Sequence, residues 1–246
     1  MGDKNWRVPL GVGLIALSAL LYFGHYLMFH DAHHIFIYMV GDIAFVPIEV
    51  LLVTLIIHQV LSRREKRALL RKLNMVIGAF FSEVGTELLG RLSEFDPDSL
   101  RVAEALRPTA TWRTADFERA ATQVAAYTAG VDGRRSGLVP LRDLLLARRE
   151  FLLRLLENPN LLEHETFTDL LWAVFHLTEE LAFRADLDAL PESDVEHLSG
   201  DIQRAYGLLA GEWLRYMQHL MADYPYLYSL ALRTNPLDPD ARPEVV

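Results

Sequence analysis

The chain has 246 residues, of which 51% are hydrophobic, with a formal net charge of −9 and no cysteine. The lack of cysteine excludes disulfides and thiolate metal sites, so any metal would have to be bound by histidines and carboxylates. The acidic balance disfavours nucleic-acid binding, which requires a basic surface. The charge is also uneven, because residues 1–74 hold 8 Lys/Arg against 5 Asp/Glu and residues 75–246 hold 16 against 28.

Two apolar stretches lie near the N-terminus. Residues 8–29 contain no Asp, Glu, Lys or Arg, and residues 35–61 are apolar apart from four polar side chains. At 1.5 Å of rise per residue, each is long enough to cross a hydrocarbon core of ~30 Å. The sequence therefore predicts a two-helix transmembrane hairpin over residues 1–61, with the lipid bilayer as its partner.

Basic residues predict the orientation of this hairpin. Lys4 and Arg7 precede the first span, six Lys/Arg follow the second within residues 63–72, and the turn at 30–34 has none. Because cytoplasmic flanks are enriched in Lys and Arg, we expect a multi-pass protein of the cell (inner) membrane with both termini cytoplasmic. The basic residues are also suited to contact anionic lipid head groups.

A basic juxtamembrane amphipathic helix is predicted over residues 62–93, where apolar residues such as Leu73, Phe80 and Leu88 recur at helical spacing without proline. The chain from 94 to 235 is predicted to form a cytoplasmic α-helical domain, followed by a flexible tail over 236–246. Its helices are expected at about 99–106, 115–129, 140–156, 166–184 and 194–223.

The start of the last of these helices carries the spacing of a capping box, Ser193-x-x-Glu196. No run alternates as a strand would between hairpin turns. The predicted fold class is therefore an all-α membrane protein, a transmembrane hairpin followed by a cytoplasmic helical bundle.

Asp42 and Glu49 are the acidic residues within the second apolar stretch. Such groups are costly inside a membrane unless they face protein or water, and a spacing of seven puts both on nearly one helix face. Pro47, between them, lacks an N–H and leaves the Ile43 carbonyl without its helical donor. We therefore expect a homo-oligomeric cation channel or cation-translocating protein, in which Asp42, Glu49 and Pro47 line the path.

The alternative is that the two acids pair with polar groups of the first span. Ser18, Tyr22 and His25 lie on one face of that helix, and hydrogen bonds from them would clamp the hairpin. The protein would then be a membrane-anchored helical scaffold or interaction protein without transport activity.

Histidines form two candidate metal-binding groups. One is in the turn between the spans and comprises His30, Asp31, His33 and His34, for which solvation in a short outward turn is the simpler explanation. The other lies in the helical domain, where His176 precedes Glu180, and His197 precedes Asp201, by one helical turn. Ordinary ion pairs at this spacing explain the second group more simply than a metal.

No glycine-rich phosphate loop, Gly-x-Ser-x-Gly turn or His-Glu-x-x-His motif occurs in the chain. The sequence therefore favours a protein that is not an enzyme, with no catalytic residue and no cofactor assigned. A metalloenzyme built from histidines and carboxylates is a third hypothesis.

Overall fold

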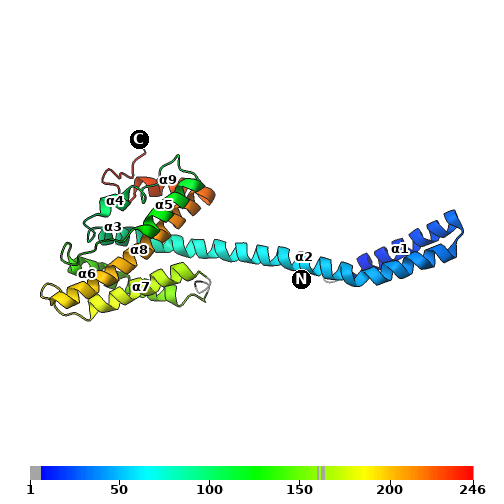
Figure 1. The fold of residues 1–246 in the computed structure, drawn as a ribbon, viewed down its shortest axis with the longest axis horizontal. Coiled ribbons are helices and arrows are strands. Elements are labelled where there is room, and N and C mark those ends of the chain that lie inside the picture. Colours follow the sequence, from blue (N-terminus) through cyan, green and yellow to red (C-terminus); the bar gives the residue numbers. More distant parts are fainter. Residues whose placement is uncertain (1–6, 160, 162–163, 246) are drawn as a thin grey trace. The chain divides into compact units, whose positions relative to one another are not determined.

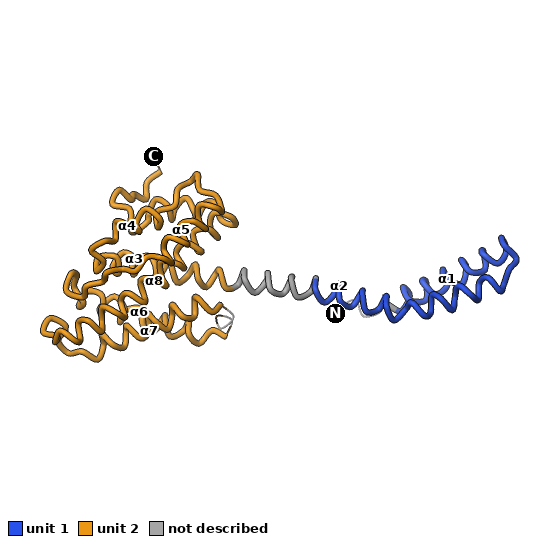
Figure 2. Tube along the Cα trace, in the orientation of Figure 1, with its two compact units in different colours: residues 1–66 blue, residues 67–246 orange. Residues whose placement is uncertain are grey.

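The computed structural model describes residues 7–159, 161 and 164–245, and the side chains of these residues except for 7 and 60–72. This part of the chain consists of helices and turns without strands, which confirms the all-helical prediction. Contacts divide the chain into two compact units, residues 1–66 and 67–246 (Figure 2).

The first unit contains helix α1, Arg7–Phe29, and the N-terminal part of helix α2, Ala32–Phe80. A two-residue turn joins them, and His30 there adopts a positive φ of 53°. The stretches Val8–Phe29 and Ala32–Gln59 are long and apolar enough to cross a membrane. Most of their large apolar side chains are exposed, and none of the most apolar window of either stretch is buried within the protein.

The second unit begins within α2, so the boundary predicted at residue 61 lies inside a helix. A π-helical turn, η1 (Phe81–Gly85), separates α2 from α3, Thr86–Ser93. Close packing explains the glycine at its end, because a Cβ on Gly85 would lie 2.7 Å from ring atoms of Phe80 and Phe81. Leu73, Phe80 and Leu88, which were predicted to share the apolar face, are buried.

The remaining helices of the second unit include α8, which is its longest helix (Figure 1). They are α4 (Ser99–Ala103), α5 (Thr114–Ala126), α6 (Leu138–Leu156), α7 (Glu165–Ala182), α8 (Glu192–Asp223) and α9 (Pro225–Arg233). Helix α8 contacts α3, α5, α7 and α9, and α6 contacts α7. The core includes Phe167 of α7 and Trp213 of α8, whose indole N–H donates to the Leu106 carbonyl at 3.1 Å.

The start of α8 differs from the predicted capping box. The helix begins at Glu192, with Pro191 as the N-cap, and no side chain caps it. The backbone N–H of Asp194 donates instead to the Pro191 carbonyl. Ser193 therefore lies inside the first turn, because the proline already fixes the extended backbone that precedes a helix.

Residues after α9 make contacts where the sequence predicted a flexible tail. Asn235, the residue before the predicted tail, is buried and donates to the Leu106 carbonyl at 3.0 Å, and within the tail Asp238 pairs with Arg107. The Pro243 carbonyl accepts a hydrogen bond from Arg233. Polar composition alone predicted disorder here, but these polar groups are paired with the helical domain.

Candidate metal centre

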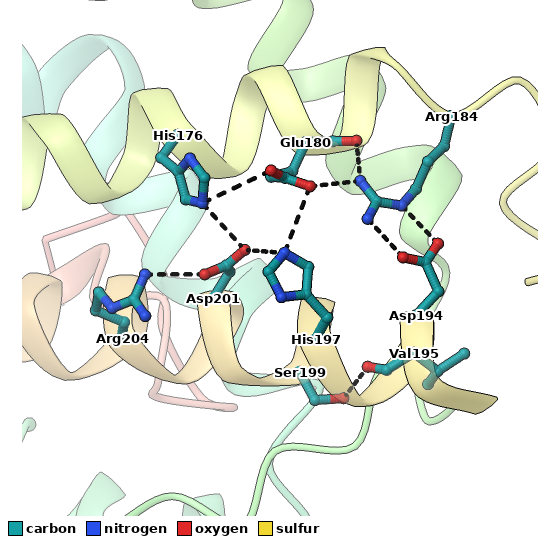
Figure 3. A network of polar contacts seen from close by, with 9 residues as sticks. All are labelled: His176, Glu180, Arg184, Asp194, Val195, His197, Ser199, Asp201 and Arg204. Carbon is teal, nitrogen blue, oxygen red and sulfur yellow. Dashed lines mark hydrogen bonds and ion pairs between the residues drawn. The ribbon is translucent and has the colours of Figure 1, made fainter. Parts of the chain in front are cut away.

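Four of the predicted metal-binding residues meet between α7 and α8 (Figure 3). His176 and Glu180 lie one turn apart on α7, and His197 and Asp201 lie one turn apart on α8. Residues at this spacing share a helix face. The short connection between the two helices makes them antiparallel neighbours, and their packing brings the two faces together.

The donor atoms of this group converge on Asp201. Its Oδ2 lies 3.4 Å from Nε2 of His176 and 3.4 Å from Nε2 of His197. Donor atoms of these three residues all lie within 4.8 Å of one another. Glu180 is adjacent, with Oε1 3.8 Å from His176 Nε2 and Oε2 3.5 Å from His197 Nε2. We refer to His176, His197 and Asp201 as the triad.

Burial distinguishes the carboxylate of the triad from its two imidazoles. Asp201 is 4% exposed, and its Oδ2 is buried without a hydrogen bond from any described residue. Its Oδ1 accepts a hydrogen bond from Arg204 Nη1 at 2.9 Å. The imidazole side chains are about half exposed, at 47% for His176 and 51% for His197. The triad therefore has a buried anionic end and an end open to solvent.

A guanidinium holds the neighbouring carboxylates in place. Arg184 donates to Glu180 Oε2 at 2.7 Å and makes two bonds to Asp194, at 2.7 and 2.6 Å. Hydrogen bonding from Arg184 lowers the pKa of both carboxyl groups, and these bonds in turn raise the pKa of Arg184. Glu180 is therefore charged and oriented beside the triad, with one oxygen bound by Arg184.

This donor set suits a divalent transition metal. Imidazole nitrogen and carboxylate oxygen are the usual ligands of zinc and of several first-row metals when no cysteine is present. Donors at 2.0–2.1 Å from a tetrahedral ion lie ~3.4 Å apart, which matches the separation of Asp201 Oδ2 from each imidazole. Two imidazoles from different helices lie beside one buried oxygen here, an arrangement that goes beyond the i,i+4 ion pairs expected from the sequence.

The candidate residues of the turn between α1 and α2 are arranged differently. Asp31 Oδ1 accepts a hydrogen bond from the backbone of His34 at 3.1 Å, and the His34 ring stacks on His25 with centroids 5.9 Å apart. Among the described residues, the triad is the group whose donor atoms converge. The structure therefore does not bring His30, Asp31, His33 and His34 together as a set of ligands.

The acids of α2 and the polar residues of α1 also remain apart. Asp42 and Glu49 are exposed, and the described residues make no hydrogen bond or ion pair with either carboxylate. Ser18, Tyr22 and His25 line a cavity of about 400 Å³ instead, which His34 and Tyr38 of α2 complete. His25 Nδ1 is buried there without a hydrogen bond from the described residues. Pro47 lies within α2.

Sequence reasoning missed Arg184, Asp194 and Arg204. Arg184 follows Glu180 by four residues and Arg204 follows Asp201 by three, so helical spacing alone indicates both pairs. The bond from Arg184 to Asp194 joins the end of α7 to the start of α8. No periodic signal marks that contact, because it depends on the turn between the two helices.

These observations define an all-helical protein with a pair of long apolar N-terminal helices and a helical domain that carries a histidine–carboxylate cluster. Residues 2–61 match the family described as the N-terminal helical domain of MJ1433, and residues 69–233 match the family described as "Uncharacterized protein MJ1433, C-terminal helical domain". The chain belongs to this family. It is 48% identical to uncharacterized protein MJ1433 of Methanocaldococcus jannaschii over 238 residues, which cover 97% of this chain and 96% of the relative. No solved structure matches significantly.

Proposed function

We propose that this protein is a membrane-anchored metal-binding protein, in which a hairpin of α1 and α2 crosses the bilayer and the helical domain binds a divalent transition metal at the triad. The observation that carries the metal assignment is the buried Asp201 Oδ2, which has no hydrogen bond and lies 3.4 Å from two imidazole nitrogens. A buried carboxylate oxygen without a hydrogen bond is unfavourable, and a bound cation would satisfy it.

The membrane assignment rests on exposed apolar surface. The two candidate spans have 22 and 28 residues, and none of their most apolar window is buried within the protein. An apolar surface of this extent is unfavourable in water and is expected to be covered by lipid or protein. The basic residues of the 63–72 segment favour the cytoplasmic side for the helical domain.

Metal titration of the full chain in detergent tests the metal assignment. After treatment with a chelator, the protein is expected to bind one equivalent of Zn²⁺ or Co²⁺, and His176→Ala and His197→Ala are expected to abolish this binding. His219→Ala is the matched control, because His219 forms a similar i,i+4 pair with Asp223 on the same helix but has no second imidazole beside it. Unchanged binding in both triad variants would refute the assignment.

A second candidate function is cation translocation by a homo-oligomer. It is favoured by the exposed Asp42 and Glu49, which have no partner among the described residues although they lie in an apolar helix. A second copy of the chain or a cation path would satisfy both carboxylates, and Pro47 frees a backbone carbonyl close to them.

Cation flux through reconstituted protein tests this candidate. Asp42→Asn and Glu49→Gln are expected to reduce the flux, because each removes one charge from the proposed path. Flux that is the same in wild type and in both variants would leave the hairpin as a tether, as in a scaffold protein.

A further inference from the structure

The triad supplies three ligands, which leaves a coordination position open on a tetrahedral ion. Glu180 is the residue nearest to this position. Its Oε2 is bound by Arg184 at 2.7 Å, and its Oε1 lies 3.8 Å from His176 Nε2, which is more than the ~3.4 Å that separates donors on a tetrahedral ion. The two half-exposed imidazoles form the solvent side of the centre. A metal held here would therefore carry an exchangeable ligand from solution.

Arg204 is placed to help hold that ligand. It binds Asp201 Oδ1, while the metal would bind Oδ2 of the same carboxylate, so the guanidinium and the ion would be immediate neighbours. The Arg204 side chain is 60% exposed, and its hydrogen bond to the described residues is the one to Asp201 Oδ1. Its remaining N–H groups are available to an anion.

The local charge makes anion binding dependent on the metal. Three carboxylates, those of Asp194, Glu180 and Asp201, face two guanidiniums, those of Arg184 and Arg204, which leaves one net negative charge on these five side chains. A divalent ion reverses this to one net positive charge. A metal beside an arginine fork favours an oxyanion with two oxygens to share over a simple halide.

A cavity beside Arg204 provides room for the rest of a ligand. It measures about 410 Å³ and lies between α5 and α8, with Val124, Tyr127, Gly200 and Gly207 among its lining residues. At 100° per residue, Arg204 lies on α8 between the face of the triad and the face of this cavity. Glycine destabilises a helix interior by ~1 kcal/mol. A Cβ on Gly200 or Gly207 would meet no atom within 4 Å, so packing within the chain does not explain either glycine.

We infer that the centre binds a small organic phosphate or carboxylate, whose oxyanion bridges the metal and Arg204 and whose apolar body occupies the cavity between α5 and α8. This inference rests on the proposed metal binding. It names the class of ligand and adds three residues to the site: Arg204 positions the ligand, and Gly200 and Gly207 leave space for it.

Titration of the Co²⁺-loaded full chain with anions tests the inference, because the visible spectrum of Co²⁺ reports its ligands. Phenyl phosphate and inorganic phosphate are expected to change the spectrum, phenyl phosphate at lower concentration, and chloride is expected to have little effect. When saturated with Co²⁺, Arg204→Ala is expected to bind both phosphates about tenfold or more weakly than wild type. Arg215→Ala is the matched control, since Arg215 pairs with Glu212 at the same i,i+3 spacing on α8.

Gly207→Leu distinguishes binding of the ligand's apolar body from binding of its oxyanion. The added side chain would enter the cavity without a clash at its Cβ. It is expected to weaken phenyl phosphate at least tenfold and to leave inorganic phosphate unchanged. A Co²⁺ spectrum that neither phosphate alters, or equal anion affinities in wild type and Arg204→Ala, would overturn the inference. Failure of the wild type to bind Co²⁺ would instead overturn the proposed function on which it rests.

Discussion

Asp201→Asn tests two effects of the same carboxylate: it lowers the stability of the metal-free protein, and it binds the metal. The wild-type carboxylate is 4% exposed, and its Oδ2 is buried without a hydrogen bond. A buried charged acceptor left unpaired costs ~1–3 kcal/mol. Asparagine retains an acceptor for Arg204, and because the Arg204 side chain is 60% exposed to solvent, weakening this bond costs about 1 kcal/mol.

We therefore expect metal-free Asp201→Asn to be as stable as wild type or more stable by ~1–2 kcal/mol, which is a few degrees in Tm for a protein of this size. The assay is thermal unfolding of the full chain in detergent after chelation, at one fixed pH for wild type and variant. Added Zn²⁺ at a hundred times its Kd is expected to stabilise wild type by ~2.7 kcal/mol and the variant by nearly nothing.

Glu212→Gln is the matched control for this experiment, because Glu212 is also buried and pairs with an arginine three residues on. It is expected to retain the full response to Zn²⁺. A loss of more than 1 kcal/mol of metal-free stability in Asp201→Asn would refute the reasoning, since it would make the carboxylate a structural group of the apo protein.

Two further predictions concern packing and pH. Gly85→Ala is expected to lower the free energy of unfolding by ~1–3 kcal/mol, because its Cβ would overlap the rings of Phe80 and Phe81. Gly78→Ala is expected to be neutral or stabilising, because its Cβ would lie 3.8 Å from its nearest neighbour. Equal Tm values for the two variants would contradict this prediction. Arg184 lowers the pKa of the two carboxyl groups it binds, so these contribute stability above the ordinary pKa of a carboxyl, and this stability is lost as the pH falls through the lowered values. Arg184→Gln is therefore expected to lose less free energy of unfolding than wild type on acidification, as measured by urea unfolding at neutral and acidic pH. A pH dependence identical to that of wild type would contradict the stabilisation of these two carboxylates by Arg184.

Much of the fold follows from local sequence patterns. The apolar stripe of α7, including Phe167, Val174 and Leu181, is buried as its spacing predicts, because helical periodicity records which face meets the core. Helix α8 ends at Asp223 as expected. The π-helical turn at Phe81–Gly85 was not predicted, since it arises from ring packing around a glycine rather than from periodicity.

The site shows why spacing alone does not identify ligands. His176, His197 and His219 each precede a carboxylate by four residues, so the three pairs are equivalent in the sequence. Two of them face each other across α7 and α8 and share Asp201. The third bonds to Asn74 at 3.1 Å and is separate from them. The packing of helices distant in sequence, which no local pattern encodes, distinguishes the candidate centre from an ordinary ion pair.

X-ray absorption at the zinc edge of the stoichiometrically loaded full chain tests the metal centre most directly. The account predicts a shell of nitrogen and oxygen donors at about 2.0–2.1 Å, with the outer-shell scattering of two imidazoles. Four-coordination by two histidines, one carboxylate and one exchangeable ligand would match the triad. A shell of oxygen donors without imidazole scattering would contradict the account, because it would place the metal away from His176 and His197.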